Sequence, residues 1–180
     1  MNDQPASLTT DDWPADIHRG LTDLQVRQVA YVPDAGHKRL IELCQADNRM
    51  RMVPLTTEEE GIGLLAGAWL GGERGALLMQ SSGVGNCINA IASIVRACQF
   101  PLFTLITMRG EWGEGNPWQV PMGTATPKVL DTMGVQLARV DRAQDVAGAV
   151  AAMGGLAFKS TVPTGVLLSQ KLIGAKSFQD

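Results

Sequence analysis

Short apolar runs alternate with longer amphipathic stretches along most of the chain. Six apolar runs have the length of buried β-strands, at residues 28–32, 51–55, 75–80, 102–108, 136–140 and 165–169. Helical patterns lie before and between them, at residues 13–24, 37–46, 59–70, 84–98, 126–133 and 143–158. Strands that alternate with helices indicate βαβ units. The sequence therefore predicts the α/β class, as a three-layer domain in which helices flank a six-stranded parallel sheet.

The domain organisation follows from length and composition. Residues 1–12 are polar and form a loose N-terminal segment, and residues 13–180 form one domain. With 180 residues, of which 45% are hydrophobic, this domain can bury a sizeable core.

Charge excludes two classes of partner. The formal net charge is −3, with only 15 Lys plus Arg, so we expect no nucleic acid and no anionic membrane as partner. The sequence shows neither a secretory signal nor an apolar run of membrane-spanning length, and we expect a cytoplasmic protein. The spacing of Cys44, Cys87 and Cys98 fits no zinc site and no disulfide framework. We expect these cysteines to be small buried hydrophobes, and no metal site on this chain.

In a parallel sheet of this kind, the loops beyond the carboxyl ends of the strands build the functional site. Four loops qualify, at residues 33–36, 56–60, 81–86 and 109–123. We therefore expect the residues that carry chemistry in these segments.

Three adjacent carboxylates, Glu58, Glu59 and Glu60, begin a segment that is otherwise small and apolar. Helix capping is one interpretation, with Thr56 or Thr57 as N-cap and a glutamate three positions on as its capping-box partner. However, a helix with so little polar surface must be covered on nearly every side. A carboxylate at its start then borders a buried surface, where it can hold an unusual protonation state and move a proton.

The segment 81–86 contains Ser82, Gly83, Gly85 and Asn86 and begins a long helix after an apolar strand. Free backbone N–H groups at such a helix start suit a phosphate, a carboxylate or a polar ring. The segment is neither a Walker loop nor a full dinucleotide fingerprint, so an ordinary Gly-rich turn is an equal alternative.

The loop 109–123 carries three Gly, two Pro and two Trp before Met122, and its length of about 15 residues is unusual for a compact domain and often functional. A covering flap without a chemical role is the alternative. Arg109 could hold a sulfonate, phosphonate or carboxylate by a two-pronged contact. It could equally form an ion pair with Glu111 or Glu114.

Five motifs together carry a family resemblance, and they stand in the family's order and spacing from about Trp13 to Ser169. They are Val32-Pro33-Asp34, Glu58-Glu59-Glu60-Gly61, the run from Gln80 to Asn86, Met108-Arg109-Gly110 and Pro121-Met122-Gly123. In this combination the chain resembles the pyrimidine-binding domain of thiamine diphosphate-dependent decarboxylases. The likeness is greatest to the alpha subunit of sulfopyruvate decarboxylase and the matching half of phosphonopyruvate decarboxylase.

The resemblance implies roles for the glutamates. In this family one glutamate hydrogen-bonds the aminopyrimidine ring of thiamine diphosphate and promotes the tautomer that activates the cofactor. It stands nine residues before a helix glycine, and counting back from Gly67 gives Glu58. Glu59 is the alternative, because three consecutive glutamates allow a slip of one residue. Ser82, Gly83, Gly85 and Asn86 would line the cofactor.

The resemblance also implies substrate-side residues. Asp34 lies where related decarboxylases place a proton-transfer or substrate-orienting carboxylate, although an Asx turn after Pro33 is an equal alternative. His37 could relay a proton, or be a surface or capping residue. Gln119 matches a family glutamine, but the histidine that follows it in some members is Val120 here. Arg109 would meet the acidic group of the substrate.

The resemblance finally implies a partner. The family holds the diphosphate through magnesium with a second domain marked by Gly-Asp-Gly, and this sequence has no Gly-Asp-Gly. We therefore expect a beta subunit that supplies this motif and the magnesium, in a heteromer that is inactive without it. A homo-oligomer of this chain is also possible. The expected reaction is decarboxylation of a 2-oxo acid, 3-sulfopyruvate or phosphonopyruvate; carboligation and a non-catalytic regulatory module on the same fold are the alternatives.

Overall fold

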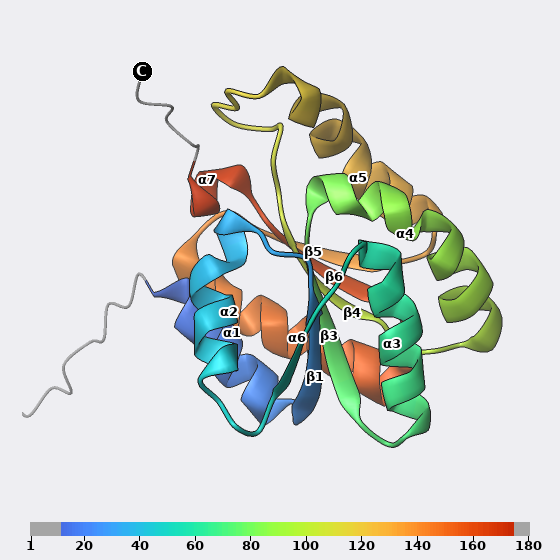
Figure 1. The fold of residues 1–180 in the computed structure, drawn as a ribbon. Coiled ribbons are helices and arrows are strands. Elements are labelled where there is room, and N and C mark those ends of the chain that lie inside the picture. The colour runs from blue at the N-terminus through green and yellow to red at the C-terminus, as the bar shows by residue number, and fades with distance from the viewer. Residues whose placement is uncertain (1–11, 175–180) are drawn as a thin grey trace, which may run out of the picture.

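The computed structural model describes residues 12–174 as an open parallel sheet covered by helices on both faces (Figure 1). Its strand order is β2-β1-β3-β4-β6-β5, and every neighbouring pair is parallel. The predicted fold class is confirmed. The expected loose segment falls almost entirely on residues 1–11, which lie outside the described residues.

The strands lie close to their predicted places. They are β1 (Val26–Tyr31), β2 (Arg51–Pro54), β3 (Arg74–Gln80), β4 (Phe103–Thr107), β5 (Gln136–Val140) and β6 (Thr164–Leu168). The α-helices are α1 (Trp13–Asp23), α2 (Lys38–Gln45), α3 (Glu58–Leu70), α4 (Val84–Ala90), α5 (Val120–Thr132), α6 (Val146–Ser160) and α7 (Gln170–Ile173). Short 3-10 turns precede α2, α4, α5 and α6, namely η1 (Ala35–His37), η2 (Ser81–Gly83), η4 (Pro117–Gln119) and η5 (Ala143–Asp145).

The sheet separates two hydrophobic cores. One joins it to α1, α2 and α6 and includes Ile17, Leu40 and Val150; the other joins it to α3, α4 and α5 and includes Ile62, Ile91 and Leu130. Figure 1 shows these two sets of helices on opposite faces of the sheet. This is the predicted three-layer arrangement.

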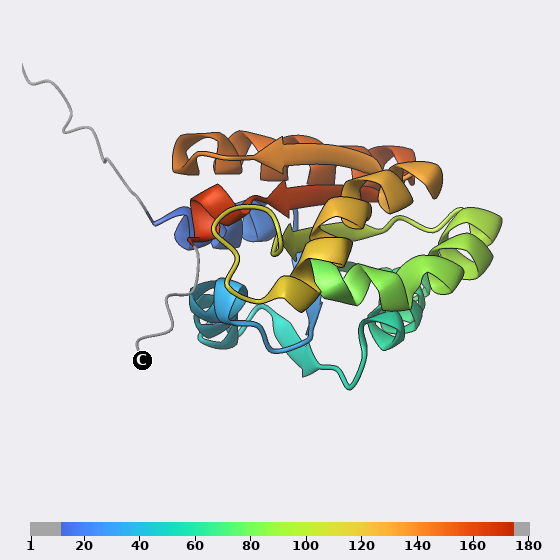
Figure 2. The same cartoon turned by 90° about the horizontal axis from the view of Figure 1, so that it is seen from above.

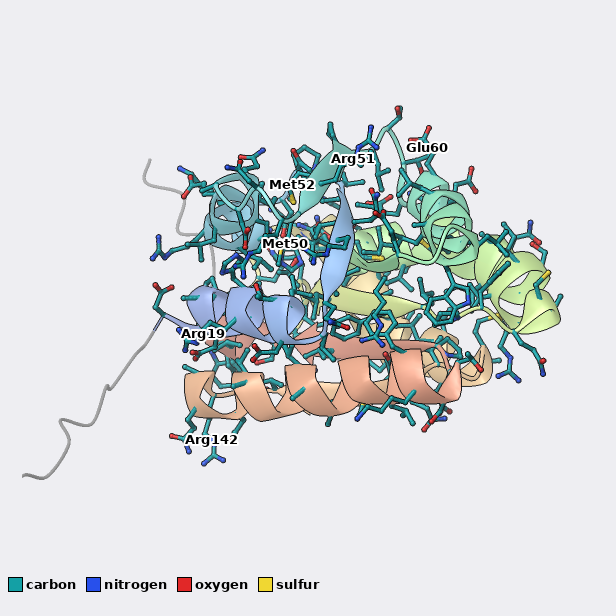
Figure 3. The ribbon with its side chains drawn as sticks, turned by 90° about the horizontal axis from the view of Figure 1, so that it is seen from below. Arg19, Met50, Arg51, Met52, Glu60 and Arg142 are labelled. Carbon is teal, nitrogen blue, oxygen red and sulfur yellow. The ribbon has the colours of Figure 1, made fainter. Side chains whose placement is uncertain are left out.

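Burial explains why strand sequences differ. The inner strands β4 and β6 are buried along their whole length and carry no charged residue; their only polar side chains are threonines, whose hydroxyls are hydrogen-bonded. The outermost strands β2 and β5 are only partly buried and carry Arg51 and Arg139, charges that discourage pairing with another sheet. Figure 3 shows Arg51 and Met52 on the edge strand β2, with Glu60 at the nearby start of α3.

Three local predictions differ from the structure. Helix α5 begins at Val120, six residues before the predicted start, because Pro121 lies in its first turn, where proline costs no hydrogen bond. The predicted helix 84–98 is α4 followed by a π-helical segment, η3 (Ile91–Arg96). The four-residue α7 is too short to give a periodic pattern.

The structure also shows the surroundings of the cysteines and the length of the helices. Cys44 and Cys87 are buried as expected, but Cys98 is exposed near the end of the α4–η3 helix, so that expectation is wrong. Residues 12–174 contain no cluster of three or more metal-ligating side chains. Over the same residues, every helix is too short or too polar to cross a membrane.

Candidate active site

The strand order brings the four candidate loops together. Strands β2, β1, β3 and β4 are neighbours in the sheet, so the segments that follow their carboxyl ends lie side by side. Viewed from above in Figure 2, the segment after β4 runs between α7 and the start of α4 and α5. We call residues 109–119 the flap.

Glu58 is the buried member of the three glutamates. It is the first residue of α3 and only 8% exposed, whereas Glu59 and Glu60 are exposed. The N-cap is Thr57, but its side chain makes no cap hydrogen bond. Glu60 instead accepts the backbone N–H of Thr56 at 2.9 Å. Capping therefore accounts for Glu60 and leaves Glu58 to be explained.

The segment 81–86 surrounds the Glu58 carboxylate. Asn86 Nδ2 donates to Glu58 Oε2 at 2.8 Å. Gly83 lies so close that a Cβ added there would stand 2.2 Å from Glu58 Oε1. Ser82 and Gly85 are exposed beside them, and Met122 Cε lies 3.5 Å from the Cβ position of Gly85. Two of the predicted cofactor residues, Gly83 and Asn86, thus contact Glu58 directly. The Glu58 oxygen Oε1 has no hydrogen-bond partner among residues 12–174.

Burial and charge near Glu58 also act on Cys87. Burial, with smaller contributions from the charges of Glu58 and Glu59, raises the pKa of the Cys87 thiol to about 12. A thiol in that state is not a nucleophile at neutral pH. Cys87 is therefore a packing residue beneath the candidate site.

Asp34 is held by donors from three segments. Its Oδ2 accepts the Thr107 hydroxyl at 2.6 Å and the Gly36 N–H at 3.1 Å, and its Oδ1 accepts Gln80 Nε2 at 3.0 Å. The Gly36 contact is the Asx turn considered as an alternative. The other two contacts fix the same carboxylate to β3 and β4.

His37 is fully buried, so it is not a surface residue. Its Nε2 lies 3.1 Å from the Leu105 carbonyl oxygen and 3.3 Å from that of Met79, an arrangement in which Nε2 carries the proton and donates. Burial lowers the pKa of His37, and the nearby Asp34 charge offsets part of this effect. The enclosed ring is uncharged at neutral pH, and a direct contact with substrate would need the surrounding segments to move.

Arg109 forms the ion pair that was its alternative role. Its Nε and Nη2 donate to the two carboxylate oxygens of Glu114 at 2.8 and 2.6 Å, and both side chains are more than nine-tenths buried. Glu114 also accepts Gln170 Nε2 and the N–H groups of Gly110 and Asn116. The hydrogen bond from Arg109 lowers the pKa of Glu114 to about 2.

Helix α7 holds the other side of the flap. Gln170 Oε1 accepts the N–H groups of Glu111 and Trp112, both at 2.9 Å. Glu111 in turn pairs with Arg139 at 2.6 Å, and Lys171 lies 4.5 Å above the Trp112 ring. The flap is thus ordered around a buried carboxylate, and it leaves Trp112 and Trp118 59% and 71% exposed.

Gln119 closes the flap against β3. Its Nε2 donates to Gln80 Oε1 at 3.1 Å, while its own Oε1 is buried without a hydrogen-bond partner in the described part of the chain. The structure therefore brings Asp34 and Gln119 to the two ends of the Gln80 side chain.

Four residues of this network were not among the predicted site residues: Gln80, Thr107, Glu114 and Gln170. Gln80 is the first residue of one of the five family motifs, and its position directly before the Ser-Ser-Gly turn could have indicated a site residue. Thr107 ends a buried strand and Gln170 follows one, so position at a strand end could have indicated both. Only Glu114 had been considered, as a partner of Arg109.

Comparison with curated proteins identifies relatives of this chain. The chain is 41% identical over 119 residues to the sulfopyruvate decarboxylase subunit alpha of Methanococcus maripaludis, which covers 66% of this chain and 71% of that protein. Its identity to the same subunit of Methanocaldococcus jannaschii is 43% over 115 residues, covering 64% and 68%. This chain belongs to the sulfopyruvate decarboxylase alpha-subunit family. The resemblance inferred from the motifs is confirmed.

The sulfopyruvate decarboxylase alpha-subunit family has longer relatives. The chain is 34% identical over 161 residues to a phosphonopyruvate decarboxylase of Streptomyces viridochromogenes, and the match covers 88% of this chain but 41% of that protein. A 2-oxoglutarate:ferredoxin oxidoreductase from Magnetococcus marinus shares the fold, with a TM-score of 0.64, 13% identity and coverage of 89% of this chain and 29% of that one. No family model matches the sequence.

Proposed function

We propose that this chain is the alpha subunit of a thiamine diphosphate-dependent decarboxylase that converts 3-sulfopyruvate to sulfoacetaldehyde and carbon dioxide. The observation that carries the proposal is the Glu58 carboxylate. It lies buried at the carboxyl edge of the sheet, in a chain whose relatives are named sulfopyruvate decarboxylase subunit alpha. Glu58 rather than Glu59 fits the role, because Glu59 is exposed.

The residues present fit the pyrimidine end of the cofactor. Asn86 occupies one Glu58 oxygen and leaves Oε1 to accept an N–H of a ring, and glycine at position 83 lets the Glu58 carboxylate pack directly against the turn after β3. Ser82, Gly85 and Met122 would line the same ring. When bound, thiamine diphosphate supplies the electron sink for loss of carbon dioxide.

The other site residues have defined tasks in this proposal. Asp34, fixed by Thr107 and Gln80, moves or orients a proton on the substrate side. Arg109 holds the flap through Glu114 and offers its remaining group, Nη1, to the substrate sulfonate. His37 stays neutral, and its backbone N–H donates to the Asp34 carbonyl oxygen at 3.2 Å.

A beta subunit with a Gly-Asp-Gly motif would hold the diphosphate and magnesium. The names of the relatives imply a partner subunit. Four large apolar side chains, Leu70, Trp112, Trp118 and Val120, are exposed on this chain and would be covered in the heteromer.

Calorimetric titration tests the proposal. Thiamine diphosphate with magnesium is titrated into this chain, alone and mixed with a Gly-Asp-Gly partner, and carbon dioxide release from 3-sulfopyruvate is followed in parallel. We expect binding and turnover only in the mixture, both lost in Glu58→Gln and kept in the matched control Glu59→Gln. No binding in any mixture would refute the enzyme and favour the regulatory module.

Phosphonopyruvate is the second candidate substrate. It is favoured by the match to the Streptomyces protein, which covers 88% of this chain. Measuring kcat/KM for both 2-oxo acids with the same enzyme preparation decides between them, because the true substrate has the higher value.

A further inference from the structure

The Gln80 side chain connects three loops of the candidate site. Its Nε2 donates to Asp34 Oδ1 at 3.0 Å, and its Oε1 accepts Ser82 Oγ at 2.9 Å and Gln119 Nε2 at 3.1 Å. Asp34 belongs to the loop after β1, Ser82 to the turn after β3, and Gln119 to the flap after β4. One amide therefore links the loop after β1, the turn after β3 and the flap.

The orientation of this amide is determined by its partners. An ionised carboxylate only accepts hydrogen bonds, so the NH₂ end of Gln80 must face Asp34. Its carbonyl end then faces Ser82 and Gln119, so Gln119 must donate a hydrogen bond from its own NH₂ group. This leaves Gln119 Oε1 buried without a hydrogen-bond partner in the described part of the chain. The Asp34 charge thus fixes the direction of two successive amides.

We propose that Gln80 is a positioning residue, which holds the Asp34 carboxylate and the flap residue Gln119 in a single hydrogen-bonded chain. Its effect on turnover rests on the proposed decarboxylase, whereas the hydrogen-bonded chain itself does not. Gln80 acts through Asp34 and Gln119, and its two ends have opposite requirements: a donor for Asp34 and an acceptor for Gln119.

Few other groups near Asp34 titrate. His37 lies on the same turn and is buried, and Lys38 and Glu42 line a surface pocket of about 470 Å³ together with Asp34. From β3 and β4, Asp34 meets Gln80 and Thr107, neither of which titrates. If a variant carries a carboxyl group at position 80, a new titration in its pH profile can therefore be assigned to that group.

Two variants of Gln80 separate positioning from packing. Gln80→Met keeps the approximate volume but has neither donor nor acceptor. Gln80→Glu has both when protonated, since a carboxylic acid donates through O–H and accepts through its carbonyl oxygen. When ionised, it retains the acceptor for Gln119 but repels Asp34. Exposed Gln136→Met is the control.

The first measurement uses the chain alone. The side-chain NH₂ resonances of Gln119 are recorded in ¹⁵N-labelled protein at pH 7. We expect Gln80→Met to move them towards the values of a free amide, and Gln136→Met to leave them unchanged. Unchanged Gln119 resonances in Gln80→Met would overturn the inference, whatever the enzymatic activity.

The second measurement is the pH profile of kcat/KM in the heteromer. We expect Gln80→Met to lower kcat/KM by about tenfold to a hundredfold at every pH. Gln80→Glu should approach the wild type at low pH, where it is protonated, and lose activity as the pH rises. Identical profiles for the two variants would overturn the positioning role. A wild-type mixture without any turnover would refute the proposed function, and the Gln119 resonances would still decide the inference.

Discussion

Gly83 provides the sharpest test of the Glu58 site, because its substitution by alanine acts on one neighbouring side chain. An added Cβ would lie 2.2, 2.3 and 2.6 Å from Oε1, Cδ and Cγ of Glu58. Gly83 has φ −70° and ψ −19°, values that alanine adopts without strain. The obstacle is therefore the Glu58 side chain and not the backbone conformation.

The fold can accommodate Gly83→Ala by turning Glu58 away. A strained side-chain rotamer costs about 0.5–1.5 kcal/mol, so we expect a loss of about 1 kcal/mol in the free energy of unfolding. The displaced carboxylate no longer meets Asn86 or the cofactor. Hydrogen bonds to charged groups are worth about 1.5–3 kcal/mol, which corresponds to a tenfold to hundredfold weaker binding of thiamine diphosphate.

Denaturant unfolding and calorimetric titration of the heteromer measure the two effects separately. Gly148→Ala is the matched control, since Gly148 lies in α6 with no atom within 4 Å of the added Cβ. It should stabilise the chain by about 0.5–1 kcal/mol and leave cofactor binding unchanged. The reasoning fails if Gly83→Ala binds thiamine diphosphate as the wild type does, or if it loses about 4 kcal/mol of stability.

Three further predictions concern the flap and the exposed surface. Because Arg109 lowers the Glu114 pKa from 4.5 to about 2, Glu114→Gln should cost about 3 kcal/mol of unfolding free energy above pH 4.5, and the difference from wild type should shrink as the pH falls towards 2 in denaturant titrations. Gly123→Ala should cost more than about 3 kcal/mol, measured in the same way, since its Cβ would lie 2.1 Å from the Arg109 backbone oxygen, which cannot turn aside. Leu70→Asp and Trp118→Asp should leave the unfolding midpoint of the isolated chain nearly unchanged but weaken its association with the partner in sedimentation experiments, because both side chains are exposed here. Unweakened association in both variants would remove both side chains from the proposed interface.

The strands of the sheet could be predicted from the sequence because the inner strands β4 and β6 carry no charged residue. Strands β4 and β6 are buried along their whole length, and threonine is the only polar residue type in either strand. Helix α5 was predicted too short because Pro121 and Gly123 are read as breakers from sequence. In the structure, Pro121 lies in the first turn, and Gly123 allows the helix to pass close to Arg109.

The sequence indicated which loops carry the candidate site residues, but it did not indicate which side chains contact one another. Motif spacing singled out Glu58 over Glu59, and burial in the structure agrees with that choice. The sequence could not show that Arg109 pairs with Glu114, because an ion pair within the flap and a contact with the substrate require the same guanidinium. Nor could it show that Gln80 joins Asp34 to Gln119, since residues 39 and 46 positions apart meet only after the sheet has formed.

The charge distribution of the site is a separate argument for a partner. Among residues 12–174, Asp34 and Glu58 form no ion pair and are held by neutral donors alone. The guanidinium of Arg109 is already engaged by a buried carboxylate. A 2-oxo acid with a sulfonate or phosphonate group would bring further negative charge beside these two carboxylates, and like charges at close range repel. Cationic side chains from a second subunit would offset this negative charge, so the electrostatics of the chain favour a site completed by its partner.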